Sequence, residues 1–318
     1  MGEDLFWAIR GGGGASFGVI LAWKVQLVDV PERVTTFTIQ RTLEQNATQL
    51  IHRWQYIAHK FDQDLFIRIF LVRINTGQDG RNMTILARFN SVFFGGIDRL
   101  LPMMQKSFPE LGLTREDCTE TSWIQSILSF AGFPIESREV LLNRTQPSVS
   151  YFKAKSDYVQ KPIPEYGLEG IWRLFYEAEG ARAVIILTPY GGRMDEISES
   201  ALPFPHRAGN LYQIQYLVSW AEDEAQNSDR YINWIRRLYD YMALYVSRSP
   251  RAAYVNYRDL DIGNNNNKGK ISYARASIWG MKYFNNNFDR LVRVKTMADP
   301  KNFFRNEQSI PSLSLKLN

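Results

Sequence analysis

The chain has 318 residues, a length that allows one large domain or two of ordinary size. Hydrophobic residues make up 45% and charged residues 22%, which excludes a disordered chain, and a net charge of +5 is too small to indicate a nucleic-acid-binding protein. The longest stretch without a charge, residues 121–135, contains Gln, Ser, Gly and Pro and is shorter than the ~20 apolar residues of a membrane span. A single cysteine, Cys118, excludes an internal disulfide and a multi-cysteine zinc site.

The first residues hold a run of four glycines and none of the features of a signal peptide. We therefore expect the chain to begin partway through a larger protein. Residues 17–28 are apolar at almost every position, which predicts a strand buried on both faces and ended by Pro31. Residues 34–39 alternate with threonines and predict a second strand.

The next segment alternates between helical and strand patterns. Apolar residues at helical spacing predict a helix over 46–61, and two strands are expected at 65–72 and 84–94, joined by a turn at Asp79-Gly80. A short helix is expected at 97–108. This order, with short turns between strands, indicates an α+β layer with an antiparallel sheet.

The second half of the chain shows regular hydrophobic periodicity only in some segments. Residues 109–170 are rich in turn formers, and we expect only loops and short helices there. Strands are predicted at 183–187 and 211–220, a long helix at 222–246, and a last helix at 288–295 before an Asp-Pro stop.

The glycine run, in RGGGGASFG, is the first candidate for chemistry. Glycines permit positive φ and let a ligand approach backbone N–H groups closely. The run does not match a phosphate-binding loop or a dinucleotide fingerprint. Both a ligand-binding loop and a flexible turn fit the pattern.

The strand at 211–220 is the second candidate. Its even positions form an apolar face, whereas Gln213 and Gln215 lie together on the other face. Two neighbouring amides could bind a ligand, or they could be the solvated side of an antiparallel sheet.

The segment 254–261 concentrates polar groups in an apolar setting. Tyr257 could act as a base only if a neighbouring group stabilised its phenolate, because the usual pKa of tyrosine is about 10. The alternative is a structural ion pair between Arg258 and Asp259 or Asp261.

Other site types have little support. The chain has three histidines, His52, His59 and His206, and the first two lie two helical turns apart, which is too far for joint metal ligation, so no metal site is predicted. No nucleophile elbow is present. Three N-x-[ST] sequons favour a secreted glycoprotein; they begin at Asn46, Asn82 and Asn143.

Five segments together resemble the plant berberine-bridge-enzyme-like FAD-linked oxidases, the group that includes reticuline oxidase and the cannabinoid synthases. They are DLFWAIRGGGGASFG at 4–18, DCTETSWI at 117–124, YGGRMDEISESALPFPHRAGNLY at 190–212, YVNYRDLDIG at 254–263 and WGMKYFNNNFDRLVRVKTMADPKNFFRNEQSIP at 279–311. The resemblance runs over essentially the whole chain.

The resemblance implies an α+β fold with two parts. Residues 1–30 would be the tail of a vanillyl-alcohol-oxidase-type (PCMH-type) FAD-binding domain, and residues 31–247 a substrate-binding domain with an antiparallel sheet covered by helices. Residues 248–318 would return to complete the FAD domain. The chain would then be the C-terminal portion of an oxidase.

The resemblance also implies roles for single residues. Tyr257 matches the base that removes a proton from a substrate hydroxyl while a hydride passes to the flavin, and Gln213 stands where relatives carry Glu or Lys to assist that base. Gln215 and Tyr190 are the expected substrate-pocket residues. The expected FAD-contacting residues are Gly11, Gly12, Gly13, Gly14, Ser16 (where many relatives carry Asn), Phe17, Gly18 and Asn256.

Two functions follow as alternatives. In the first, the protein is a secreted, monomeric oxidase of an alcohol, carbohydrate, phenol or alkaloid, with O₂ or another electron acceptor and no nucleic-acid or membrane partner. In the second, the chain is a non-catalytic remnant or a ligand-binding module. The second is favoured by the expectation that the His and Cys that attach FAD covalently lie upstream of this sequence, since Cys118 matches a different segment.

Overall fold

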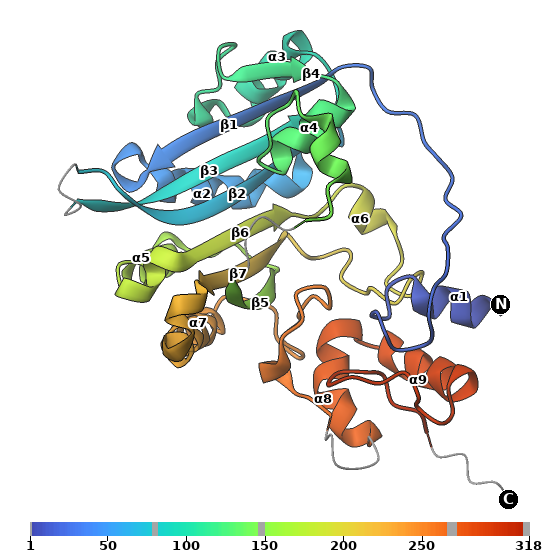
Figure 1. The fold of residues 1–318 in the computed structure, drawn as a ribbon. Coiled ribbons are helices and arrows are strands. Elements are labelled where there is room, and N and C mark those ends of the chain that lie inside the picture. Colours follow the sequence, from blue (N-terminus) through green and yellow to red (C-terminus); the bar gives the residue numbers. More distant parts are fainter. Residues whose placement is uncertain (1, 78–81, 146–149, 266–271, 314–318) are drawn as a thin grey trace, which may run out of the picture.

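A seven-stranded antiparallel sheet organises most of the chain, with strand order β4-β1-β3-β2-β6-β7-β5 (Figure 1). The computed structural model describes residues 2–77, 82–145, 150–265 and 272–313. The strands are β1 Val34–Thr42, β2 Leu65–Asn75, β3 Met83–Phe93, β4 Cys118–Thr121, β5 Tyr151–Val159, β6 Ala183–Pro189 and β7 Tyr212–Trp220. The helices are α1 Glu3–Ile9, α2 Ala47–Ile57, α3 Ile97–Ser107, α4 Trp123–Phe130, α5 Glu165–Phe175, α6 Arg193–Glu196, α7 Ser228–Met242, α8 Tyr273–Phe284 and α9 Asn287–Ala298.

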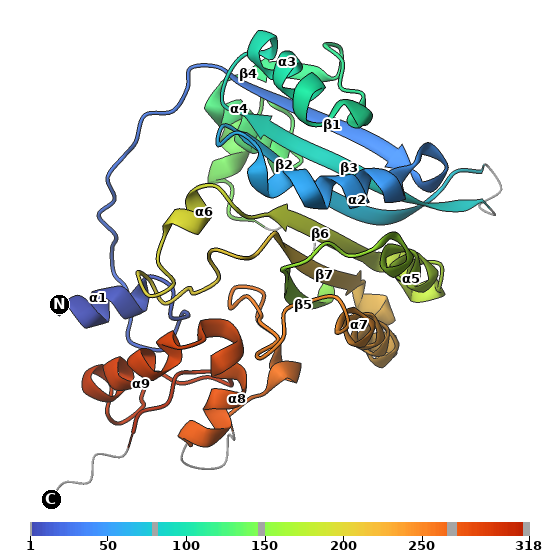
Figure 2. The ribbon, with the colours of Figure 1, turned by 180° about the vertical axis from the view of Figure 1, so that it is seen from behind.

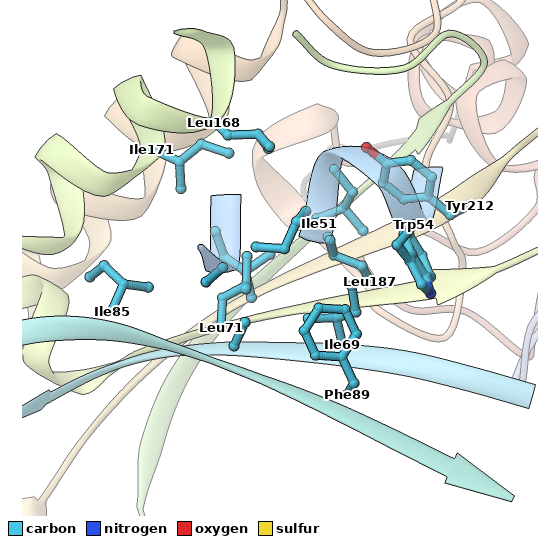
Figure 3. Packing of buried hydrophobic residues seen from close by; sticks show 14 of the residues in the cluster. Ile51, Trp54, Ile69, Leu71, Ile85, Phe89, Leu168, Ile171, Leu187 and Tyr212 are labelled. Atoms are coloured by element: carbon cyan, nitrogen blue, oxygen red, sulfur yellow. The ribbon is translucent and has the colours of Figure 1, made fainter. Parts of the chain in front are cut away.

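One face of the sheet is covered by helices because its strands alternate. In β2, Leu65, Ile67, Ile69 and Leu71 are buried while the residues between them are half-buried. Their side chains meet apolar residues of α2 and α5 in the main hydrophobic cluster (Figure 3). Trp54 fixes the contact, since its indole N–H donates to the carbonyl oxygen of Ile67 at 3.1 Å. The predicted antiparallel sheet with covering helices is confirmed.

A second hydrophobic cluster forms at the other end of the molecule. It is built from α1, α8 and α9, with Trp7, Trp279, Phe288 and Leu291 among its buried residues. Figure 2 shows these helices grouped below the sheet, with the N- and C-terminal parts of the chain side by side. Helix α9 confirms the predicted last helix, whereas α1 and α8 were not predicted.

Residues 18–33 do not form the predicted strand. They run as an extended trace from α1 to β1 (Figures 1 and 2), and its first part lies against α1, where the ring centroids of Trp23 and Phe6 are 6.4 Å apart. Leu21 is 94% exposed and Leu27 87% exposed. An apolar strand needs neighbouring strands to pair with, and no described residue pairs with this segment.

Elements in the middle of the chain depart from the prediction. Residues 109–170 contain strands β4 and β5 and the first part of helix α5, which ends at Phe175, where only loops and short helices were expected. The turn predicted at Asp79-Gly80 lies outside the described residues. The helix predicted at 222–246 begins as a 3₁₀ turn at Glu222–Asn227 and continues as α7.

Candidate functional site

The candidate site lies on the sheet face opposite α2, α5 and α7. Ile69 is paired with Leu187, and Leu187 with Ile214, and all three side chains are buried in the main hydrophobic cluster. Because neighbouring residues of a strand point to opposite faces of the sheet, Arg68 and Gln213 lie on the other face. Tyr158 of β5 is paired with Gln213 and shares that face. Three strands therefore supply polar side chains to one surface that the second cluster approaches.

Gln213 belongs to a buried hydrogen-bonded chain. Its side chain is 4% exposed, so the alternative of a solvated sheet face is wrong at this position. The Gln213 amide donates to the Tyr158 hydroxyl at 3.1 Å, and the Tyr190 hydroxyl donates to the same oxygen at 3.4 Å. Burial raises the pKa of Tyr190 to about 12 and also raises the pKa of Tyr158 well above its usual value, so both phenols stay protonated at neutral pH.

The predicted base, Tyr257, lies in the loop before α8 and contacts Tyr254 edge-on, with ring centroids 5.0 Å apart. Asn256 beside it donates to the Tyr254 hydroxyl at 2.8 Å. Partial burial raises the pKa of Tyr257, and the positive charge of Arg68 acts in the opposite direction. The group that could stabilise a phenolate here is therefore Arg68, which the sequence did not indicate.

A cavity of about 540 Å³ brings several predicted residues together. Its wall includes Gly11, Gly13 and Gly14 from the glycine loop, Tyr190 from the loop after β6 and Asn256 from the loop before α8. Gly13 has φ of +90°, a conformation that favours glycine. Tyr257, Gln213 and Gln215 are not among the lining residues. Gln215 is half-buried on the same face of β7 as Gln213.

The remaining residues of the loop have a packing role. A Cβ on Gly12 would lie 2.5 Å from the carbonyl oxygen of Ala8 and 2.6 Å from Leu291 Cδ2, so glycine permits α1 to approach α9. Phe17 is buried in the second cluster, and the buried Ser16 accepts a hydrogen bond from Lys295 at its carbonyl oxygen. These residues and Gly18 do not line the cavity.

The expected ion pair of Arg258 is wrong. Arg258 donates to the side chain of Asn306 at 2.9 Å. Asp259 instead accepts from Lys153 at 2.6 Å and from Lys155 at 2.7 Å, both on β5. Asp261 pairs with the same lysines and with Arg236 of α7. We call these five residues the charge cluster.

The other candidates occupy unremarkable positions. Burial raises the pKa of the half-buried Cys118 thiol to about 11, which disfavours the reactive thiolate. Among the described residues, no group of three or more His, Cys, Asp or Glu side chains could hold a metal ion. The sequon residues Asn46, Asn82 and Asn143 are all exposed. None of the helices that the structure describes is long and apolar enough to cross a membrane.

The aromatic partners of the site were missed in the sequence. Tyr158 stacks on the buried His206 with ring centroids 4.1 Å apart, and Phe204 meets Tyr254 edge-on at 5.7 Å. Tyr158 is on a strand that was not predicted. The segment 204–207 contains no periodic pattern, so only its place in the fold shows that it completes the cavity wall.

Comparisons with known proteins agree on one family. Residues 253–311 match the family model described as "Berberine and berberine like". The chain is 53% identical over 98% of its length to monolignol oxidoreductase AtBBE-like 13 of Arabidopsis thaliana and 52% identical over 99% to tetrahydroberberine oxidase of Berberis wilsoniae. The structure of BBE-like #28 from Arabidopsis thaliana superimposes with a TM-score of 0.92 at 51% identity, over 98% of this chain.

The match covers only part of each relative. The chain spans 57% and 59% of the two curated relatives and 63% of the solved chain. The same fold, the matching family segment and the high identity over nearly all 318 residues lead to one conclusion. The chain belongs to the berberine-bridge-enzyme-like family and corresponds to the C-terminal portion of its members.

Proposed function

We propose that this chain is the substrate-binding and C-terminal part of an FAD-dependent oxidoreductase that oxidises an alcohol, a carbohydrate, a phenol or an alkaloid. The observation that carries the proposal is the position of Tyr257. It stands beside the cavity, in contact with Tyr254 and under the influence of the Arg68 charge. A phenol with a cation near it can remove a proton from a substrate hydroxyl.

The cavity wall fits a cofactor that lies against backbone. Gly11, Gly13 and Gly14 present main chain without side chains to the cavity, and among the described residues the N–H groups of Gly13 and Gly14 have no backbone acceptor. Asn256 adds a side-chain amide. FAD, when bound, supplies the acceptor for a hydride. In this proposal the glycine loop and Asn256 hold the cofactor, Tyr190 and Gln215 contact the substrate, and Tyr257 takes its proton.

Gln213 carries no charge that could support the base, so its proposed role is a different one. Its amide is neutral and hydrogen-bonded to Tyr158, which in turn is hydrogen-bonded to Tyr190. We propose that Gln213 fixes the orientation of these two phenols at the substrate end of the cavity. Electrostatic support of the Tyr257 phenolate then comes from Arg68 on β2.

The wider assignments are also part of the proposal. Residues 1–30 and 248–318 would belong to the FAD domain and 31–247 to the substrate domain, and the two separate hydrophobic clusters support this division. The whole protein would be a secreted monomer that passes electrons to O₂ or another acceptor. The exposed sequons Asn46, Asn82 and Asn143 support glycosylation.

The test of the base is Tyr257→Phe in the flavin-loaded protein. Removing the hydroxyl should slow flavin reduction by roughly 10²-fold or more, because general-base catalysis contributes about that factor. Tyr176→Phe, at an exposed tyrosine in the turn after α5, is the matched control and should react like the wild type. Stopped-flow absorbance measures the rate. An unchanged rate in Tyr257→Phe would rule out Tyr257 as the base.

A ligand-binding module without turnover is the second candidate. It is favoured by the cavity of about 540 Å³, which residues of this chain form by themselves. The visible spectrum of the purified 318-residue chain separates the two. Flavin absorption bands that persist through gel filtration support the oxidoreductase, whereas a colourless chain that still binds a small aromatic ligand supports the module.

A further inference from the structure

Arg207 is a buried cation in the wall of the cavity. It lies between α6 and β7, and its side chain is 6% exposed. The same cavity is lined by the glycine loop, Tyr190 and Tyr254. The lining also holds the exposed Arg10, the Asn256 amide and apolar side chains, so Arg207 is the buried one of two arginines that the cavity wall contains.

The guanidinium has weak partners. One Nη lies 3.2 Å from the sulfur of Met194, a poor acceptor, and Nε has no hydrogen-bond partner. The Cζ atom lies 4.9 Å from the ring centroid of Phe204. Among the described residues, no carboxylate forms an ion pair with Arg207. A buried charge is stable only when an opposite charge or several acceptors compensate it.

In the other fully buried cations the positive charge is compensated by a carboxylate. Lys155 is paired with Asp259 at 2.7 Å, and Lys295 with Asp299 at 2.7 Å. The partly buried Arg251 forms two hydrogen bonds with Asp157, at 2.7 and 2.6 Å. Arg207 is the exception among them, and it is the one that faces a cavity.

We infer that Arg207 binds an oxyanion, a phosphate or carboxylate of the molecule that fills the cavity. The planar guanidinium donates in parallel to two oxygens of such a group. Gly13 and Gly14 also line the cavity, and their N–H groups, which have no backbone acceptor among the described residues, offer further donors. The inference rests on the proposed function in so far as that function places its ligand in this cavity. The oxyanion belongs either to the cofactor or to the substrate.

The first experiment measures the ligand-free chain. If Arg207 has no counter-ion in the ligand-free chain, Arg207→Met removes an uncompensated charge and leaves the melting temperature unchanged or higher. Arg193→Met, at an exposed arginine of nearby α6, controls for loss of net charge. Arg251→Met, which breaks a paired cation, should lower the melting temperature. A decrease for Arg207→Met as large as that for Arg251→Met would overturn the inference, since Arg207 would then have a partner within the chain.

The second experiment measures binding by equilibrium dialysis at constant ionic strength. The probes are pyrophosphate, FMN, riboflavin and benzoate. At least one anion should bind the wild type, and Arg207→Met should weaken its binding at least ~10-fold, with partial recovery in Arg207→Lys. Preference for pyrophosphate and for FMN over riboflavin identifies the cofactor phosphate, and preference for benzoate identifies a substrate carboxylate. If no anion binds, or if the Arg207→Met affinities equal the wild-type values, the inference is wrong.

The outcomes separate this inference from the proposed function. Anion binding that depends on Arg207, together with an unchanged rate in Tyr257→Phe, would refute the proposed base and support the oxyanion site. Anion binding that does not change in Arg207→Met, together with slow flavin reduction in Tyr257→Phe, would support the proposed base and overturn the oxyanion site.

Discussion

Tyr257 needs a neighbouring positive charge if it is to work as a base. Its pKa is raised by burial and by Tyr254, which keeps the phenol protonated at neutral pH, while Arg68 lowers it. Arg68 is held in place by its hydrogen bond to Asn90 at 3.2 Å and by the rings of Phe70 and Phe130. These contacts hold the Arg68 guanidinium on the sheet face that carries Gln213.

Arg68→Met should move the pH profile of flavin reduction. In the proposed mechanism the reactive form of Tyr257 is the phenolate, so the rate should rise with pH up to a pKa above the ordinary value of about 10. Without the Arg68 charge this pKa rises further, less phenolate is present at pH 8, and the rate there should fall roughly 10-fold. Arg68→Lys keeps the charge and should restore most of the rate. A profile that is the same in all three proteins would exclude Arg68 as the electrostatic partner.

His206 makes stability depend on pH in the acid range. Burial lowers its pKa to about 4, so the folded protein holds the ring neutral, with Nε2 3.1 Å from the carbonyl oxygen of Tyr283. The unfolded chain takes up a proton near pH 6.5, whereas the folded chain does so only near 4. Stability from His206 is therefore complete above pH 6.5 and is lost as the pH falls toward 4.

His206→Gln should remove this dependence. Between pH 7.5 and pH 5 the wild type should lose about 2 kcal/mol more of its free energy of unfolding than the variant, as measured by urea denaturation. Asp157 acts in the opposite sense, because burial raises its pKa to about 6, but it is present in both proteins and cancels in the difference. Parallel pH curves for the two proteins would contradict the assignment.

At the scale of elements, the charge cluster attaches the Tyr257 loop to the sheet. Asp259 is two residues after Tyr257, and both of its carboxylate oxygens are bound by lysines of β5. Arg236 adds a bidentate pair from α7 to Asp261, and together with the lysines it holds the pKa of Asp261 far below its usual range. The loop is thus fixed by β5 and α7, which belong to the main hydrophobic cluster.

Lys155→Met should destabilise the fold more than Lys153→Met does. Lys155 is 2% exposed and Lys153 is 17% exposed, so removing Lys155 leaves the carboxylates less compensated in a drier place. The expected loss is about 3–5 kcal/mol for Lys155→Met, and distinctly less for its neighbour. Urea unfolding monitored by tryptophan fluorescence checks both. Equal losses would show that burial does not decide the contribution of these lysines.

The same cluster shows why part of the fold could not be predicted. Strands β2, β3, β6 and β7 were recognised because their inward residues are apolar and alternate. Strand β5 was missed, since it buries Lys155, Ser156 and Asp157, which read as loop residues in the sequence. Their burial depends on acidic and basic partners about 100 residues away along the chain. A local pattern cannot contain that information.

The residues of the candidate site, like the strands, could be predicted only in part from the sequence. Tyr190, Asn256 and three of the glycines do line one cavity, and Tyr257 lies next to it. Arg68 and Tyr158 were missed, because only the order of strands in the sheet brings β2 and β5 to the same face as Gln213. Gly12 illustrates the opposite error, since its role in packing α1 against α9 looks identical in the sequence to a role in binding.

At the scale of the whole molecule, two hydrophobic clusters are joined by a segment that has little packing of its own. Residues 18–33 have no regular structure, and Leu21, Leu27 and Val28 are almost fully exposed. The ribbon leaves the second cluster at the glycine loop and returns to the sheet only at β1 (Figure 1). Such a segment opens without unfolding either cluster.

Trypsin should therefore cleave the folded chain at Lys24. The expected rate is independent of urea below the unfolding transition, because no buried contact must break first. Mass spectrometry identifies the fragments, and Lys24→Gln should abolish this product while leaving later ones unchanged. A cleavage rate at Lys24 that increases with urea in step with global unfolding would show that the segment is protected.

Asp259 has a mechanical consequence. Its carboxylate is bound to the sheet by two lysines, while its main chain is bound to the Tyr283 hydroxyl at 2.9 Å and to the Gln308 amide at 2.8 Å, beside the second cluster. One residue thus connects the sheet to the second cluster. Without its carboxylate, the Tyr257 loop would keep its main-chain bonds beside the second cluster and lose part of its attachment to β5. Tyr257 would then no longer be held in a fixed position relative to Arg68 on β2.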